Sequence, residues 1–93
     1  MTSETEIEFD PVKDARNLAK HGVSLADATE FEWETARTQE DVRFIYAEKR
    51  FEAKGWLRGS VHVLVFCLRG GETRVISLRR ANEREIRTYA NSN

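Results

Sequence analysis

The sequence R-V-I-S-L-R-R (residues 74–80) is typical of a strand, and it runs directly into a helix-like sequence, A-N-E-R-E-I-R-T-Y (residues 81–89). Strand alternation places Val75, Ser77 and Arg79 on one face and residues 74, 76, 78 and 80 on the other. Two adjacent arginines, Arg79 and Arg80, therefore fall where a sheet ends and a helix begins. Guanidinium groups at such a junction suit a polyanion such as RNA.

The helix that follows has a clear start in the sequence. Asn82 is a good N-cap, and Glu85 stands three residues later, where a capping-box side chain belongs. Beyond it, Ile86, Tyr89 and Ala90 share one helical face, which we expect to pack against the sheet.

The N-terminal part of the chain predicts a short strand over residues 5–9 and two helices. Asp10 is the expected N-cap of the first helix, with proline following, and Gly22 its left-handed end. Ser24 is the expected cap of the second helix, with Asp27 in the capping-box position. The expected buried faces are Val12, Ala15, Leu18 and Ala19 on the first helix, and Leu25, Ala28 and Phe31 on the second.

The middle of the chain predicts the rest of the sheet. Residues 34–41 are polar and are expected to form a loop, whereas residues 42–51 alternate like a strand and residues 54–59 form a turn. Residues 60–68 are apolar on both faces, which is typical of a central strand, and Gly70-Gly71 predicts a tight hairpin. The order β-α-α-β-β-β-α predicts one α+β domain with an antiparallel sheet packed by helices.

Composition narrows the class of protein. The single cysteine, Cys67, allows no internal disulfide, and no apolar run approaches the length of a membrane helix. The two histidines, His21 and His62, are far apart and belong to no metal-ligand motif, and no phosphate-binding glycine loop is present. We therefore expect a cytoplasmic protein that uses no cofactor or metal and contacts no membrane.

Charge is distributed unevenly along the chain. Residues 1–42 carry 4 Lys/Arg and 11 Asp/Glu, whereas residues 43–93 carry 11 Lys/Arg, nine of them arginine, and 5 Asp/Glu. Either both sets of charges only solvate the surface, or the second half binds RNA. The residues expected to bind RNA are Arg43, Lys49, Lys54, Trp56, Arg58 and Arg74.

Three stretches resemble the BrnT family of bacterial toxins. They are I-S-L-R-R-A (residues 76–81) followed by Glu85 and Tyr89, the N-terminal pair F-D-P (9–11) and N-L-A-K-H-G-V-S (17–24), and E-K-R (48–50) followed by Gly55. One departure is Phe9, which stands where many relatives carry tryptophan. The resemblance implies a RelE-like fold and a ribonuclease that arrests translation. It also implies a BrnA-type antitoxin with a ribbon-helix-helix half, through which the complex contacts operator DNA and represses its own operon.

The residues available for chemistry suit metal-independent RNA cleavage, in which the 2′-hydroxyl attacks the adjacent phosphate. Arg79 and Arg80 are candidates for stabilising the transition state, or they form ordinary ion pairs with Glu83 or Glu85. His21 is a candidate acid or base, although a helix C-terminus also favours a cation there and raises the histidine pKa. The full set of catalytic candidates, with family positions taken into account, is Arg79, Arg80, Arg50, His21, Lys20, Glu85 and Tyr89.

A second function remains open from the sequence. Because no convincing acid and base pair is visible, the chain is also compatible with a catalytically inactive binding module. Such a module would keep the toxin fold and contact a DNA-binding antitoxin within an autoregulatory repressor complex.

Overall fold

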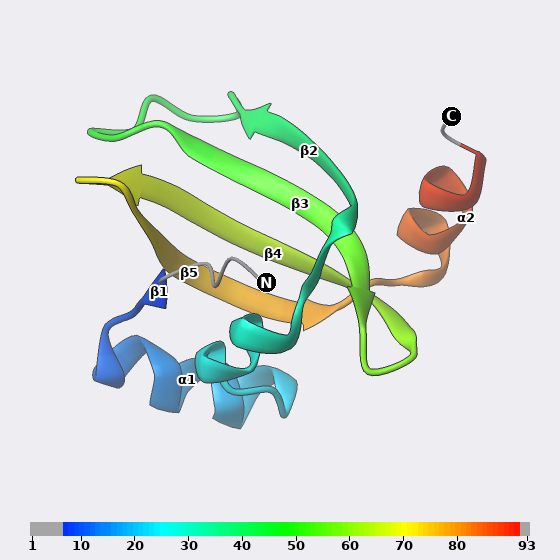
Figure 1. The fold of residues 1–93 in the computed structure, drawn as a ribbon, viewed down its shortest axis with the longest axis horizontal. Coiled ribbons are helices and arrows are strands. Elements are labelled where there is room, and N and C mark those ends of the chain that lie inside the picture. The colour runs from blue at the N-terminus through cyan, green and yellow to red at the C-terminus, as the bar shows by residue number, and fades with distance from the viewer. Residues whose placement is uncertain (1–6, 92–93) are drawn as a thin grey trace, which may run out of the picture.

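The computed structural model describes residues 7–91, which form one mixed sheet with helices around it (Figure 1). The elements are β1 (Ile7–Glu8), α1 (Pro11–His21), a 3-10 helix η1 (Leu25–Glu30), β2 (Glu32–Asp41), β3 (Arg50–Leu57), β4 (Ser60–Arg69), β5 (Glu72–Arg80) and α2 (Glu83–Asn91). None of the helices in this part of the chain is long and apolar enough to span a membrane. Residues 5 and 6 of the expected first strand lie outside the described residues.

The sheet confirms the α+β class but corrects the expected strand directions. Its order is β1-β5-β4-β3-β2, and β2 through β5 pair antiparallel as a meander. β1, however, pairs parallel with β5, so the sheet is mixed and not antiparallel. The reason is topological, since β1 is followed by α1 and η1 and the chain returns to pair with β1 only through its last strand.

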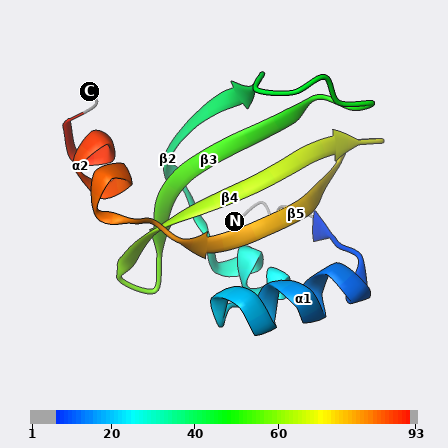
Figure 2. The same ribbon diagram turned by 180° about the vertical axis from the view of Figure 1, so that it is seen from behind.

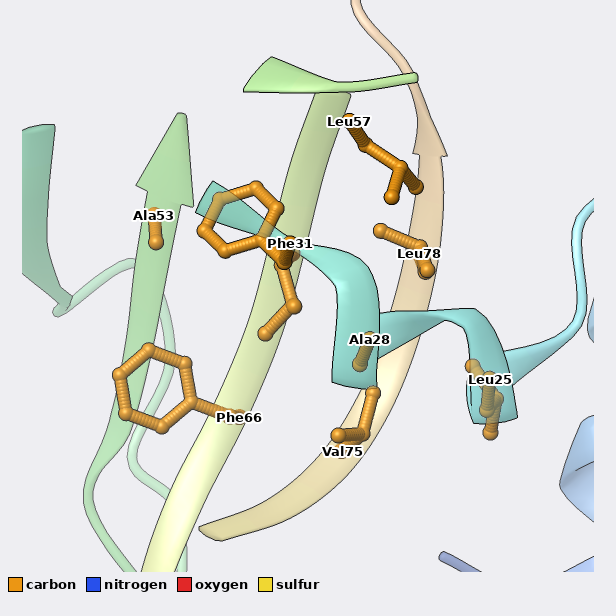
Figure 3. Packing of buried hydrophobic residues seen from close by; sticks show 9 residues of the cluster. Leu25, Ala28, Phe31, Ala53, Leu57, Phe66, Val75 and Leu78 are labelled. Carbon is orange, nitrogen blue, oxygen red and sulfur yellow. The ribbon is translucent and has the colours of Figure 1, made fainter. Parts of the chain in front are cut away.

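The hydrophobic core lies on one face of the sheet, beneath η1 (Figure 3). Aromatic rings extend it towards β2, where Trp33 meets Phe31 and Phe66 edge-on at centroid distances of 5.0 and 5.2 Å. The buried cluster consists of Leu25, Ala28, Phe31, Ala53, Leu57, Leu64, Phe66, Val75 and Leu78. The expected buried side of residues 25–31 is therefore confirmed. Its spacing of three residues suits the 3-10 geometry seen there better than the expected α-helix.

α1 begins and ends as expected but packs the other way round. Asp10 caps it by accepting from the Val12 N–H, and Gly22 ends it with φ at 72°. The prediction that its apolar face is buried is wrong, because Val12 is 59% exposed and Leu18 is 50% exposed. The helix instead turns Asn17 inward.

Asn17 explains this orientation, because α1 packs along the open edge of β5 rather than over an apolar face. Its side-chain amide donates to the carbonyl of Leu78 (2.7 Å) and accepts from the Leu78 N–H (3.3 Å). It also donates to the carbonyl of Val23 (2.8 Å). One buried amide thus takes the place of a neighbouring strand, satisfying backbone groups that would otherwise be unpaired.

The region between residues 32 and 50 departs most from the prediction. The expected polar loop is β2, the edge strand, which pairs with β3 from Arg37–Lys54 to Asp41–Arg50. The expected strand over residues 42–51 is mostly an irregular loop, and β3 starts only at Arg50. The cause is Asp41, whose buried carboxylate accepts from the Arg43 backbone and guanidinium and from the Tyr46 hydroxyl, and so bends the chain out of the ladder.

The next hairpin also differs from the expected turn over residues 54–59. Only Arg58 and Gly59 form the turn, and both have positive φ (49° and 82°), as a two-residue hairpin of this type requires. Gly55 lies within β3 and not in the turn. Glycine suits this position because a Cβ there would lie 2.9 Å from the ring of Phe31. The Gly70-Gly71 hairpin is confirmed.

β5 contains a bulge that breaks the expected alternation. Val65 pairs with Ser77 but the next residue, Phe66, pairs with Val75, so Ile76 is the extra residue. As a result Val75 and Leu78 both reach the core, which strict alternation from residue 74 to 80 does not allow.

α2 stands apart at the end of the sheet where β5 finishes, as both views show (Figures 1 and 2). The reciprocal cap is confirmed, since the Glu85 N–H donates to Asn82 and the Asn82 N–H donates to Glu85. The expected packed face is wrong in part, because Ile86 is 43% exposed and no residue of α2 is buried. The helix is held by polar contacts, including the Tyr89 hydroxyl, which donates to the carbonyl of Thr35 on β2 (2.6 Å).

Candidate functional site

A shallow cleft of about 270 Å³ lies between α1 and β5. The packing of Asn17 on the strand edge creates it, and the bulge brings Ile76 and Ser77 to its wall. Its lining is basic: Lys13, Arg16, Asn17, Lys20, His21, Ile76 and Ser77.

The cations of the cleft share one side of α1. Lys13, Arg16 and Lys20 follow the spacing i, i+3 and i+7, which is the same side that carries Asn17. None of these three forms an ion pair or side-chain hydrogen bond with another residue in the range 7–91. Their charges are therefore available to an external anion.

His21 closes this row at the end of α1, where it is half-buried. Burial, then the charges of Lys20 and Arg79, hold the pKa of His21 below its ordinary value. The sequence-based expectation of a raised pKa is wrong, because these effects outweigh the favourable helix terminus. The imidazole is therefore mostly neutral near pH 7 and can accept a proton. The hydrogen bonds of Asn17 to the carbonyls of Val23 and Leu78 place the end of α1 beside the end of β5.

Arg79 is engaged by the capping residue of α2. Its two terminal nitrogens contact the two carboxylate oxygens of Glu85, both at 2.8 Å. This pairing is the main reason why the pKa of Glu85 falls to about 2. A carboxylate that is ionised, capped and paired in this way is a structural partner and is not poised to exchange a proton at neutral pH.

Arg80 lies beside Arg79 but differs in being exposed. Within residues 7–91 its guanidinium donates only to the Ser60 hydroxyl, at 3.3 Å. His62 is its direct partner across the β4–β5 ladder, and the Nδ1 of His62 is 3.0 Å from the Ser60 carbonyl oxygen. At this end of the sheet Asn17 joins the end of α1, which carries Lys20 and His21, to Leu78, the residue before Arg79. Arg80 lies beside Ser60 and His62.

Two other catalytic candidates are placed elsewhere. Arg50 lies opposite Asp41 at the far end of β3, with its guanidinium 4.5 Å from the ring centroid of Tyr46. Arg80 pairs with His62, and His62 pairs with Gly55 on β3. Arg50 lies five residues from Gly55, which is about 17 Å along the strand. Tyr89 faces β2, where its hydroxyl already donates to Thr35.

The residues expected to bind RNA are mostly committed to acidic partners. Arg58 pairs with Asp27 and Glu30, Arg74 with Glu8, Arg43 with Asp41, and Lys54 with Glu52. Lys49 is exposed in the loop between β2 and β3, and Trp56 is 38% exposed on β3.

These pairs change the meaning of the uneven charge distribution. Arginines of the second half of the chain meet acids of the first half, as in Arg58–Glu30 and Arg74–Glu8, so the two halves do not form two charged surfaces. Among the described residues, three cations without an acidic partner lie on α1, in the acidic half of the sequence: Lys13, Arg16 and Lys20. Lys49, Arg50, Arg80 and Arg84 of the second half also form no ion pair with a described acid.

A protein-family model for BrnT, the ribonuclease toxin of type II toxin–antitoxin systems, matches residues 9–85. The chain belongs to the BrnT family. The matched range includes the whole of α1, the end of β5 and the Glu85 that pairs with Arg79. No curated protein matches the chain. A type II system includes an antitoxin, so this BrnT protein has an antitoxin partner.

Sequence reasoning identified Lys20, His21, Arg79 and Arg80 as site candidates but missed two cations of the cleft. Lys13 and Arg16 are absent from that prediction because it takes the apolar residues of the helix as the face that packs on the sheet. The helical spacing of Lys13, Arg16 and Lys20 was the signal that could have revealed them. Within residues 7–91 no group of three His, Cys, Asp or Glu side chains is arranged to hold a metal ion.

Proposed function

We propose that this BrnT protein is an endoribonuclease whose RNA substrate binds in the cleft between α1 and β5. The observation that supports this proposal most is the row of unpaired cations on α1, which ends at a histidine with a lowered pKa. A phosphodiester backbone along Lys13, Arg16 and Lys20 would bring a scissile phosphate towards His21 and the arginines at the end of β5. Cellular RNA in the cytoplasm is the proposed substrate, and its loss would stop translation.

The proposed reaction needs no metal ion. Neutral His21 takes the proton of the 2′-hydroxyl, the 2′ oxygen attacks phosphorus, and the bond to the 5′ oxygen breaks. Lys20, next to His21 in the chain, supplies the ammonium that protonates the leaving oxygen. Arg80 stabilises the charge that develops on the phosphorane, because its guanidinium is exposed and lacks an acidic partner among the described residues.

Glu85 and Tyr89 are proposed to support the site from outside. Glu85 fixes the guanidinium of Arg79 in position, and Tyr89 fastens α2 to β2. Arg79 then acts as a positioned positive charge, which adds to burial and to the charge of Lys20 in lowering the pKa of His21. Arg50 lies too far away to join this group.

The antitoxin is proposed to be of the BrnA type, with a DNA-binding half that carries the toxin to operator DNA. The family membership supports a protein partner, and its identity is part of the proposal.

The test compares RNA cleavage by the purified chain with that of a Lys13→Ala/Arg16→Ala/Lys20→Ala variant, in buffer containing EDTA. The parent should cleave RNA despite the chelator, and the triple variant should lose most cleavage and RNA affinity. Each lost phosphate contact should lower the slope of log affinity against log salt by about 0.7. Lys49→Ala is the matched control, because Lys49 is exposed at the other end of the sheet.

Two results would count against the proposal. Equal cleavage by the triple variant would show that RNA does not bind in the cleft. Loss of activity in EDTA would show a metal requirement. Binding of RNA without any cleavage would favour the inactive binding module.

A further inference from the structure

The end of the sheet opposite the cleft carries exposed apolar side chains. In the loop over residues 42–49, Val42, Phe44 and Ile45 are 75%, 67% and 104% exposed. Leu68, near the end of β4 on the same side of the molecule, is 59% exposed. Neighbouring large apolar side chains that face solvent are typical of a surface that contacts another molecule.

This loop is held in shape by contacts at both of its ends. Asp41 accepts from the guanidinium of Arg43 at 2.9 and 2.8 Å and from the Tyr46 hydroxyl at 3.0 Å. The pairing with Arg43 keeps the pKa of Asp41 well below its usual range. The carboxylate of Asp41 therefore remains charged, and its contact with Arg43 persists, at physiological pH.

The other end of the loop is fastened to the sheet. The ring of Tyr46 lies against the guanidinium of Arg50, and Glu48 pairs with Arg69 on β4. Phe44 and Ile45 are thus presented on a fixed frame, although nothing in the described part of the chain covers them. Such preorganisation lowers the entropic cost of binding a partner.

An acidic hollow of about 300 Å³ adjoins the loop. Glu40 is exposed and forms no ion pair or hydrogen bond with a side chain in the described range, whereas Glu52 pairs with Lys54. The hollow is lined by Gln39, Glu40, Asp41, Val42, Arg43 and Glu52, so acids outnumber bases three to one. Because Asp41 is paired with Arg43 and Glu52 with Lys54, Glu40 is the carboxylate of the hollow that remains available to a cationic side chain.

β2 forms one wall of the hollow and is the last strand on its side of the sheet. Its edge therefore has no strand partner among residues 7–91, and an extended peptide could run alongside residues 37–41.

We infer that the loop over residues 42–45 and the adjoining acidic hollow form the docking surface for the antitoxin. The occupant is an antitoxin segment that places a lysine or arginine in the hollow and apolar side chains against Phe44 and Ile45. The unpaired carboxylate of Glu40 suits a cationic side chain, and membership of a type II toxin–antitoxin family supplies a protein partner. The inference does not depend on the RNA cleft, which lies at the other end of the sheet.

The experiment titrates the full chain with the purified protein encoded by the neighbouring reading frame and measures affinity by calorimetry. Phe44→Ser/Ile45→Ser and, separately, Glu40→Lys should each weaken binding by about tenfold or more. The second variant tests the surface without changing the loop. The matched controls are Val12→Ser/Leu18→Ser, which alters exposed apolar residues of α1, and Glu34→Lys, which reverses an exposed acid on the same strand.

RNA cleavage and sedimentation of the same variants identify any other occupant. The variants should cleave RNA at the parent's rate. Their sedimentation should also match the parent's, because self-association of the chain does not depend on Phe44 and Ile45. Unchanged affinity of both test variants, or absence of any binding by the neighbouring protein, would overturn the inference while leaving the cleavage test of the cleft intact. Loss of cleavage without loss of partner affinity would assign the surface to RNA. Loss of a dimer would assign it to a second copy of the chain.

Discussion

Arg79 and Glu85 face each other through two parallel contacts of 2.8 Å, Nη1 to Oε1 and Nη2 to Oε2. The pair joins the end of β5 to the first turn of α2, and the same carboxylate also receives the Asn82 N–H. Because α2 buries no residue, this contact carries much of the attachment of the helix to the sheet. It also fixes a positive charge that lowers the pKa of His21 further, after burial and the charge of Lys20.

Acid should therefore release α2 before it unfolds the sheet. The pKa of Glu85 falls from 4.5 to about 2 on folding, chiefly through its contact with Arg79. A lowered carboxyl pKa gives stability that is present above pH 4.5 and is lost as pH falls towards 2. NMR secondary shifts of residues 83–91 at pH 6 and pH 2 should show this loss. In Glu85→Gln the helix should be weakened at pH 6 already, with little further change in acid, and an equal acid response in both proteins would contradict the assignment.

Asn17 should be the most sensitive position on α1. Asn17→Ala leaves the N–H and carbonyl of Leu78 and the carbonyl of Val23 without their side-chain partner. Loss of partners to buried backbone groups should reduce the free energy of unfolding by about 2–3 kcal/mol. Denaturant titration measures this, with Leu18→Ala as the neighbouring control, expected within about 0.5 kcal/mol of the parent because Leu18 is exposed. Equal effects of the two changes would mean that α1 is held by its apolar residues after all.

Local signals in the sequence predicted local structure well. Asp10 and Gly22 set the limits of α1, Asn82 and Glu85 form the cap of α2, and Gly70-Gly71 forms its hairpin. Each of these depends on contacts within a few residues, which spacing alone can reveal. The junction between β5 and α2 was also predicted, since Arg79 and Arg80 come directly before a capped helix.

Features set by distant contacts were not predictable in the same way. The side of α1 that faces β5 depends on a hydrogen bond between Asn17 and Leu78, 61 residues apart. The strand expected over residues 42–51 fails because Asp41 binds Arg43 and Tyr46, and alternating side chains do not show this. Ion pairs such as Arg74–Glu8 cancel charges that look separate in the sequence.

Arg80 should affect cleavage without affecting stability. Its side chain is exposed and has one long hydrogen bond to Ser60, so removing it disturbs little packing. Arg80→Ala should lower single-turnover cleavage by about tenfold to a hundredfold while leaving the melting temperature unchanged. Arg84→Ala removes an exposed cation from α2 and serves as the control. A cleavage rate equal to that of the parent would exclude Arg80 from the site.

We propose that neutral His21 acts as the base in the cleft between α1 and β5. The most direct test is the pH dependence of single-turnover RNA cleavage by the parent and by His21→Gln. The parent rate should rise with pH through a pKa below 6.5 and then level off, since burial, Lys20 and Arg79 all lower the pKa of His21. His21→Gln should cleave at least about a hundredfold more slowly and lose that rise. A folded His21→Gln protein with the parent's rate and pH profile would exclude His21 as the base.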